Sequence, residues 1–355
     1  MQSYNKSFEK LVKVNSYNFK NNYSEKLFKK IFSELYIHHI KNSKIYKDIL
    51  SRYKSSKLNQ YFLPARIFKE LDIISIDKNK VFKILNSSGT SGRQSKIYLD
   101  KNNSVTQTKI LSKLYQDFFK IKKRSPMIIF DRSDIIKDRK LFSARGVGIL
   151  GFSIFGKDHF YAFNEKNKLR EKELLTYLNK HKNEKILIFG LTNIIWENLV
   201  NLRKSSSVKK YLRKSTLIHG GGWKKLVSQK ITNQRFKSVL RKRLGIKNVF
   251  NYYGMVEQTG SIFFECERGY FHTSIFSDIK ILDKHFTEQN YLKKGIVQLF
   301  SLLPTSYPGH NLLTEDEGII YGKNNCKCKR KGKFFKIIGR LKKSETRGCS
   351  DNYDL

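Results

Sequence analysis

Short apolar runs alternate with amphipathic segments in the middle of the chain, and this alternation restricts the folds open to it. Three runs, at 185–192, 215–222 and 249–254, read KILIFGLT, STLIHGGG and VFNYYG. Segments with helical periodicity separate them at 194–202 and 231–244. Strands that alternate with helices predict a sheet of parallel strands with ligand sites at the strand carboxyl ends. The runs STLIHGGG and VFNYYG both end in glycine at the expected carboxyl end of a strand, which predicts a ligand site there.

The flanking segments extend this α/β prediction in both directions. Residues 24–53 carry apolar side chains at helical spacing, and a helix over 103–119 precedes a strand over 127–130. From 261 to 303 the pattern changes to short strands without long helices. The predicted parts are a helical entry region at 1–80, an α/β core at 81–260, a β-rich subdomain at 261–338 and a hinge-like motif with the tail at 339–355.

The charge of the chain is strongly positive, with 71 Lys and Arg against 30 Asp and Glu and a formal net charge of +41. These residues are spread along the chain, and no recognition helix, zinc-finger spacing or RNA-binding motif accompanies them. We therefore expect no specific nucleic-acid partner. The charge should still attract anions such as nucleotides, acyl phosphates or acidic membrane surfaces.

The composition also bears on the compartment. No run of about 18 uncharged apolar residues occurs, and the first twenty residues lack the apolar block of a secretory signal. The four cysteines, Cys266, Cys326, Cys328 and Cys349, are too few for a disulfide scaffold and suggest metal or thiol chemistry in a reducing compartment. A cytoplasmic protein without a transmembrane segment is the expectation.

A short turn rich in serine and glycine offers a second candidate site. Residues 85–96 read LNSSGTSGRQSK and lie between two β-rich runs, so the turn is predicted to connect two strands. Its glycines allow the backbone to approach a ligand closely, its hydroxyls are neutral donors, and Lys96 supplies a positive charge. These groups suit a phosphate. The turn does not match a Walker A loop, and by itself it is equally well explained as a structural hairpin.

Four motifs resemble those of the adenylate-forming superfamily, the acyl-CoA synthetases and their relatives. The first is SSGTSGxxxK at 87–96, and the second is YYGMVE at 252–257. LLTEDEG at 312–318 is similar to the superfamily's Thr-Gly-Asp motif. Glu315 replaces the glycine of that motif, so the match does not define the conformation of the turn at this position. GRLKKSETRG at 339–348 is similar to its hinge motif. Because the four occur in the superfamily's order, they favour an ATP-dependent enzyme.

This resemblance implies a role for each motif. The turn would bind the phosphates of ATP, Glu257 would hold magnesium, and the aromatic residue before Gly254 would stack near adenine. Asp316 would bind the ribose hydroxyls. HGGGWKK at 219–225 lies where the superfamily lines the adenine and acyl pocket, and the alternative for Trp223 is an ordinary core aromatic. The implied nucleotide-binding residues are Ser87, Ser88, Gly89, Thr90, Ser91, Gly92, Gly220, Gly221, Tyr253, Gly254, Asp316 and Arg340.

The end of the chain is similar to a narrower family. FLPARIFKEL at 62–71, SLLPTSYPGHNLLTEDEG at 301–318 and the short ending CSDNYDL are similar to the LuxE-type acyl-protein synthetases. In that family a cysteine near the C-terminus takes the acyl group as a thioester, which implies Cys349 as acceptor. Arg347 beside it favours the reactive thiolate, and an inert surface thiol is the alternative. The resemblance implies the superfamily's large N-terminal domain with its mobile C-terminal domain largely absent.

The other cysteines suggest a metal site. Cys266 and His272 flank ERGYF, and one residue separates Cys326 from Cys328. Three thiols and an imidazole are a standard ligand set for structural zinc, and some phenylacetate-CoA ligase relatives are similar here and bind zinc at this place. The one-residue spacing is tighter than in common zinc knuckles. The alternative is that Cys266 is a small buried apolar residue and that the pair is incidental.

The predicted function is thus ATP- and magnesium-dependent activation of a carboxylic acid, fatty in this family, and transfer of the acyl group to Cys349. Lys96, Glu257 and Cys349 are the predicted catalytic residues. The family implies a fatty acyl reductase as the partner that accepts the acyl group. One alternative is a ligase of the same superfamily that loads coenzyme A or a carrier protein, and the other is a non-enzymatic, basic nucleic-acid-binding protein.

Overall fold

Two compact units make up the described part of the chain. The computed structural model describes residues 2–18, 21–52, 61–87, 93–136, 144–200, 202, 205–222 and 231–341. Unit 1 contains the described residues of 1–87, 93–120 and 254–345, and unit 2 contains those of 121–253. The four-part division of the chain stays a prediction.

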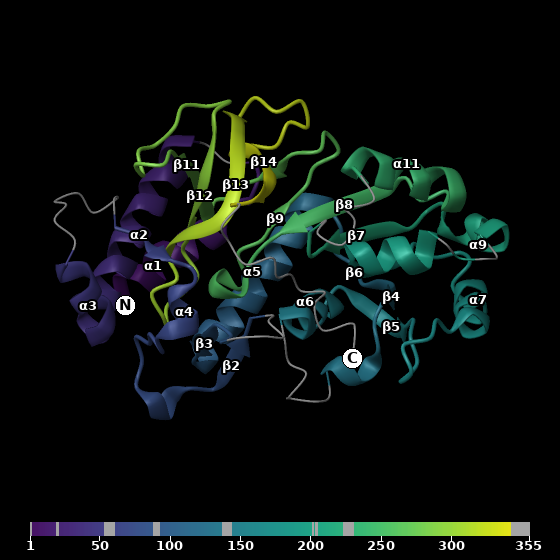
Figure 1. Cartoon of the computed structure of the whole chain (residues 1–355), viewed down its shortest axis with the longest axis horizontal. Coiled ribbons are helices and arrows are strands. Elements are labelled where there is room, and N and C mark those ends of the chain that lie inside the picture. The colour runs from purple at the N-terminus through teal and green to yellow at the C-terminus, as the bar shows by residue number, and fades with distance from the viewer. Residues whose placement is uncertain are drawn as a thin grey trace. The chain divides into compact units, whose positions relative to one another are not determined.

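Unit 2 is built on parallel strands, labelled in Figure 1. They lie side by side in the order β5, β4, β6, β7, β8, and each is parallel to its neighbour. They are β4 (Ser125–Ile129), β5 (Gly156–Tyr161), β6 (Leu187–Leu191), β7 (Thr216–Gly220) and β8 (Asn248–Tyr253). β6 is buried along its whole length, as expected of an apolar strand covered on both faces. The predicted parallel α/β core is confirmed.

Helices follow the strands of unit 2. They are η3 (Ser133–Ile136), α6 (Ala144–Ser153), α7 (Glu171–Lys180), α8 (Thr192–Ile194), η5 (Ile195–Val200), α9 (Ser205–Leu212) and α11 (Asn233–Leu244). The helix predicted at 194–202 begins earlier, at Thr192, and continues as a π-helix. The second predicted helix is α11, which begins after the capping side chain of Thr232 and ends at Gly245, where φ is 73°. Local capping signals therefore set its bounds.

Unit 1 contains an antiparallel sheet in the order β10, β14, β13, β12, β11, with β1 parallel to β13. Its strands are β1 (Leu63–Pro64), β10 (Phe271–His272), β11 (Ser277–Leu282), β12 (Lys294–Ser301), β13 (Asn311–Lys323) and β14 (Lys333–Arg340), and β9 (Phe263–Phe264) precedes β10 in the chain. A separate hairpin is formed by β2 (Lys83–Asn86) and β3 (Lys96–Leu99). The short strands predicted after residue 261 are confirmed.

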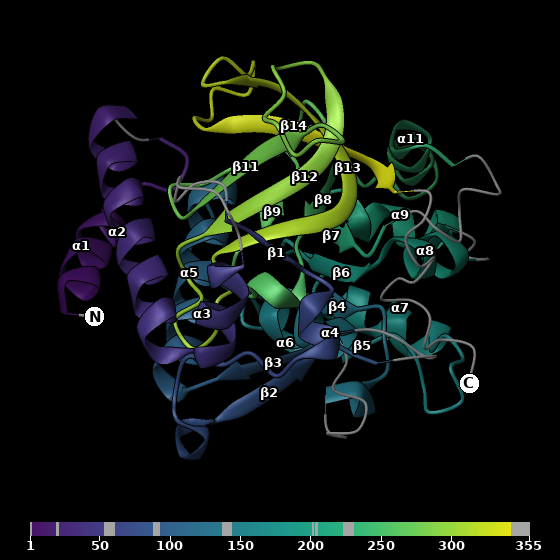
Figure 2. The same cartoon turned by 60° about the vertical axis from the view of Figure 1, so that its left-hand side comes forward.

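The helices of unit 1 pack beside this sheet. They are α1 (Gln2–Val12), α2 (Asn21–Asn42), α3 (Lys44–Ser51), α4 (Ile67–Glu70), η2 (Lys78–Lys80), α5 (Lys101–Phe119) and η6 (Val256–Gln258). Figure 2 shows α1 and α2 side by side, and Tyr4 Oη donates to Leu302 O at 2.8 Å. The helix predicted at 24–53 divides at Ser43, whose side chain caps α3. Among the helices that the structure describes, none combines the length and apolar character needed to cross a bilayer.

Candidate active site

The serine- and glycine-rich turn belongs to the β2–β3 hairpin of unit 1. Asn86 lies opposite Lys96, and beyond this pair Ser87 N donates to Ser95 O at 3.0 Å. Ser95 N donates in turn to Ser87 Oγ at 2.8 Å, so these two serines close the base of the turn. The predicted connection of two strands is confirmed, and Lys96 is exposed. The remaining predicted phosphate ligands lie outside the described residues: Ser88, Gly89, Thr90, Ser91 and Gly92.

Glu257 is a buried carboxylate close to this hairpin. It lies in η6 and is 8% exposed. Burial raises the pKa of its carboxyl above the ordinary value, while Ser95 of the hairpin, Lys69 of α4 and Arg340 of β14 act in the opposite direction. A divalent cation favours the ionised form of such a carboxyl, so Glu257 fits the predicted magnesium ligand.

A glycine contact holds η6 in place. A Cβ on Gly309 would lie 2.6 Å from Glu257 O and 2.4 Å from the Tyr307 ring, so this close approach requires glycine. Gln258 Nε2 donates to Gly309 O at 2.8 Å and to Leu299 O at 3.2 Å. Glu257 is therefore positioned by the segment that reads SLLPTSYPGHN, one of those that carry the family resemblance.

Asp316 and Arg340 face each other on neighbouring strands. They are register partners in β13 and β14, and Arg340 Nε lies 3.5 Å from Asp316 Oδ1. Glu315, which replaces the expected glycine, lies inside the 13-residue strand β13, where the chain is extended. Leu341 N donates to Glu315 O at 2.9 Å and continues the pairing. The proposed ribose carboxylate is thus carried by a strand.

Gly220 ends β7, and Gly221 follows it. A Cβ on Gly220 would lie 2.4 Å from the ring of Tyr252, so this close approach requires glycine. The nucleotide contact of both glycines stays a prediction. Gly221 has a φ of 86°, which favours glycine. Tyr253 is half-buried and Gly254 is exposed. Trp223 lies outside the described residues.

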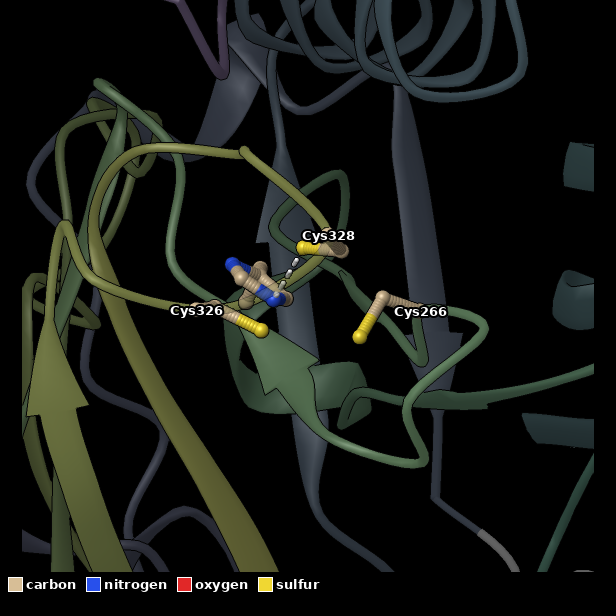
Figure 3. A group of neighbouring side chains, drawn as sticks. Cys266, Cys326 and Cys328 are labelled. Atoms are coloured by element: carbon tan, nitrogen blue, oxygen red, sulfur yellow. Dashed lines mark hydrogen bonds between the residues drawn. The ribbon is translucent and has the colours of Figure 1, made fainter.

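Three cysteines and a histidine come together in unit 1 (Figure 3). Cys266 lies in the turn between β9 and β10, His272 ends β10, and Cys326 and Cys328 lie between β13 and β14. Their ligand atoms all lie within 4.8 Å of one another, and Cys328 Sγ is 3.3 Å from His272 Nε2. Tetrahedral zinc with bonds of about 2.0–2.3 Å places its ligand atoms roughly 3.5–3.8 Å apart. The set fits zinc.

The protonation of the thiols agrees with such a site. The neighbouring Cys266 thiol, followed by His272, lowers the pKa of Cys328 well below its ordinary value. The pKa of Cys266 is raised by Cys328 and by burial, and burial raises that of Cys326. Cys328 is thus stabilised as the thiolate, while Cys266 and Cys326 favour the protonated thiol. A divalent cation would stabilise all three as thiolates, with release of protons.

Nearly the whole sequence matches one protein family. The family is described as acyl-protein synthetase, LuxE, and the match covers residues 5–354. The chain belongs to this family. Its members are acid–thiol ligases, so the LuxE-family chain is an enzyme. No curated protein matches it.

Solved structures with the same fold are adenylate-forming CoA ligases. 2-Hydroxyisobutyryl-CoA ligase, in an open conformation with 2-HIB-AMP and CoA, has a TM-score of 0.71 and 12% identity over 94% of this chain and 79% of that one. The same ligase in its thioesterification state has a TM-score of 0.64 and 13% identity over 89% of this chain and 68% of that one. ATP-bound MatB from Rhodopseudomonas palustris has a TM-score of 0.50 and 14% identity over 75% of this chain, which spans 49% of MatB. The predicted adenylate-forming fold is confirmed.

The structure adds residues that the motifs did not mark. Ser95 and Lys69 influence Glu257, and both lie in segments quoted for the family resemblance without a role of their own. Asp131 and Arg145 line a pocket in unit 2 but belong to no motif. Cys349, the predicted acyl acceptor, lies outside the described residues.

Proposed function

We propose that this LuxE-family enzyme uses ATP and magnesium to activate a carboxylic acid, expected to be fatty, as an acyl adenylate and then transfers the acyl group to its own Cys349. An acceptor protein, expected from the family to be an acyl reductase, would then receive it. The observation that supports the proposal most is the position of the hairpin within unit 1. Ser95, at the base of the turn, is close enough to Glu257 to favour its ionised form, which supports assigning the proposed phosphate turn and the proposed metal ligand to one site.

Activation is needed because the oxygen of a carboxylate is a poor leaving group. In the proposed first step, a carboxylate oxygen of the acid attacks the α-phosphorus of ATP, and the bond to pyrophosphate breaks. Lys96 and the hydroxyls of the turn would stabilise the negative charge that builds on the phosphates. Magnesium neutralises part of this charge when it is bound, and Glu257 would hold it. Asp316 would position the ribose.

The proposed second step transfers the acyl group to sulfur. The Cys349 thiol loses its proton, the thiolate attacks the acyl carbon, and AMP leaves with the electrons of the broken bond. Arg347 and the net charge of +41 favour the thiolate. The product is a thioester, which remains reactive enough for an acceptor to take the acyl group.

We assign the Cys3His cluster to a structural zinc site. The four protein ligands fill a tetrahedral coordination sphere, which leaves no position for substrate. The ligands come from two segments that are far apart in sequence, so bound zinc would link the β9–β10 turn and strand β10 to the β13–β14 loop. Arg330, which pairs with Glu267 at 2.7 Å and lies 4.0 Å from the centre of the Phe118 ring, places a positive charge beside the thiolates.

The zinc assignment predicts one zinc ion per chain in the purified protein. Cys266→Ser should lose the metal and lower the free energy of unfolding by several kcal/mol, on the order of 3–5, because the ligand set can no longer be completed. Metal analysis and denaturant unfolding measure both effects. Cys349→Ser, which removes the remaining cysteine, is the matched control and should keep the metal. Metal-free wild-type protein that also fails to bind added zinc would refute the assignment.

A second function of the same class has one observation in its favour. The solved structures with this fold include 2-hydroxyisobutyryl-CoA ligase in complex with 2-HIB-AMP and CoA. An enzyme that loads CoA would use the same first step and then transfer the acyl group to the free thiol of CoA. Acyl-CoA should then form only when CoA is added, and no acyl group should remain on the protein.

The proposal is tested by incubating the purified chain with ATP, magnesium and a panel of carboxylic acids. We expect acid-dependent release of pyrophosphate and an increase in intact mass equal to the acyl group. Neutral hydroxylamine should remove this mass, because it cleaves thioesters. A chain that releases no pyrophosphate with any acid and gains no mass would contradict the proposal.

A further inference from the structure

Unit 2 contains a long stretch of sequence without any acidic residue. Lys and Arg are spread along the whole chain, but Asp and Glu are not: none of the 30 lies between 198 and 253, whereas 15 Lys and Arg do. A general enrichment in lysine explains many basic residues, but it does not explain why acidic residues are missing from one segment. The segment therefore carries a concentrated positive charge.

Part of this charge gathers where two helices of unit 2 end side by side (Figure 1). Both α9 and α11 end next to Gly245. Lys209 Nζ donates to Lys242 O at 3.0 Å, and a Cβ on Gly245 would lie 3.0 Å from the side chain of Arg213. We call the six exposed basic side chains at these two helix ends the basic face: Lys210, Arg213, Lys214, Arg241, Lys242 and Arg243.

The charges of the basic face are not balanced by the protein itself. None of the six takes part in an ion pair between described residues, whereas other exposed lysines do, as Lys157 does with Glu184 at 2.7 Å. The dipole of a helix favours a basic residue in the last turn. α11 has three there, α9 has two, and neither has an acidic residue in its first turn. Because neighbouring like charges repel, this arrangement opposes folding and suggests a negatively charged partner.

The character of the surface distinguishes between kinds of partner. In the described residues of 205–222 and 231–253, no large apolar side chain is exposed. The basic face therefore lacks the apolar centre that a stable protein interface needs. It also offers no exposed aromatic ring on which a base of single-stranded nucleic acid could stack. A layer of anionic lipid head groups requires neither feature, because Lys and Arg bind it through charge.

We propose that the basic face binds the enzyme to an anionic membrane surface. Clusters of about four to eight Lys and Arg on a helix bind acidic lipids, and the basic face has six. Duplex nucleic acid is bound through charge as well. The choice of lipid over duplex rests on the proposed function, because a fatty acid partitions into a bilayer and an enzyme held there meets its substrate at a high local concentration.

The test measures co-sedimentation with vesicles of equimolar phosphatidylcholine and phosphatidylserine, without ATP or acid. The wild-type chain should bind at low salt, dissociate at high salt and bind far less to phosphatidylcholine alone. The variant Arg213→Gln/Lys214→Gln/Arg241→Gln/Lys242→Gln removes four charges of the basic face. Its partition coefficient should fall by about 10²-fold or more, since each Lys or Arg near such a surface contributes about fivefold. Glutamine is a good helix former and removes repulsion, so the variant should keep its fold.

A matched control changes four exposed lysines outside the basic face to glutamine, so that both variants have the same net charge. Each of these lysines pairs with an acidic side chain: Lys30, Lys80, Lys157 and Lys294. The control should bind vesicles nearly as well as the wild type. An equal loss in both variants would overturn the inference, because net charge alone would then explain binding.

Two further outcomes would also overturn it. One is a wild-type chain that does not bind the anionic vesicles at low salt. The other is a basic-face variant that keeps its vesicle binding but loses binding to duplex RNA, which would assign the face to nucleic acid. Failure of the proposed function would appear instead as absent pyrophosphate release, which vesicle binding does not measure.

Discussion

Replacing Glu257 with glutamine should remove most of the acid-dependent pyrophosphate release and leave the chain folded. Glutamine has almost the same shape but no charge, so it cannot neutralise a cation held against the phosphates. We expect the rate to fall by about 10²- to 10⁴-fold, measured at saturating ATP and magnesium. Glu288→Gln removes an exposed carboxylate that pairs with Lys280 at 2.7 Å and should keep full activity. Full activity of Glu257→Gln would disprove the proposed role.

The pH dependence of this site has a defined direction. Burial raises the pKa of Glu257 above the ordinary 4.5, so the folded chain holds this proton to a higher pH than the unfolded chain. Metal binding needs the ionised form, and the acid limb of the activity profile should therefore lie above pH 4.5. Binding of this proton to Glu257 therefore stabilises the folded chain. The stabilisation is complete below the pKa that Glu257 has in the unfolded chain, and it is lost as the pH rises through the higher pKa that Glu257 has in the folded chain.

The same linkage separates a catalytic role of Glu257 from a structural one. Above its raised folded pKa the wild-type side chain is a buried charge, whereas glutamine at this position is neutral at every pH. Glu257→Gln should therefore unfold at the same or a higher denaturant concentration than the wild type. A variant that loses both activity and stability would indicate a structural carboxylate.

Sequence patterns were sufficient where a local rule decides the structure. The run KILIFGLT is apolar at nearly every position, which only a strand buried on both faces tolerates, and β6 is buried throughout. α11 begins and ends at a threonine cap and a left-handed glycine. The serine–glycine turn connects two antiparallel strands because β-rich runs flank it on both sides. These features depend on residues within a few positions of one another.

The rest of the candidate site depends on contacts between distant segments. No pattern places Ser95 beside Glu257, because the fold of unit 1 brings these segments together. Asp131 and Arg145 are 14 residues apart, and neither belongs to a recognisable motif. Gly220 approaches the ring of Tyr252 closely, a contact between distant segments that no local pattern predicts.

Replacing Cys349 with serine is expected to separate the two proposed half-reactions. Acid-dependent release of pyrophosphate should continue, because Cys349 takes no part in adenylation. The hydroxylamine-labile acyl group on the protein should disappear, since a serine hydroxyl at neutral pH is a far weaker nucleophile than a thiolate. Intact mass analysis after incubation with ATP, magnesium and acid measures the difference, and Ser350→Ala is the control that should load normally.

Chain geometry makes this acceptor testable in a second way. Leu341 is held beside Asp316 by its hydrogen bond to Glu315 O, and Cys349 follows it by eight residues. Eight residues span at most about 29 Å, so Cys349 can reach only an adenylate that is held within that distance of Leu341. Deleting four residues between 342 and 348 halves this reach and should reduce loading much more than adenylation. A persistent thioester adduct in Cys349→Ser would instead place the acceptor at another thiol, and equal loading by the shortened chain would show that this reach is not limiting.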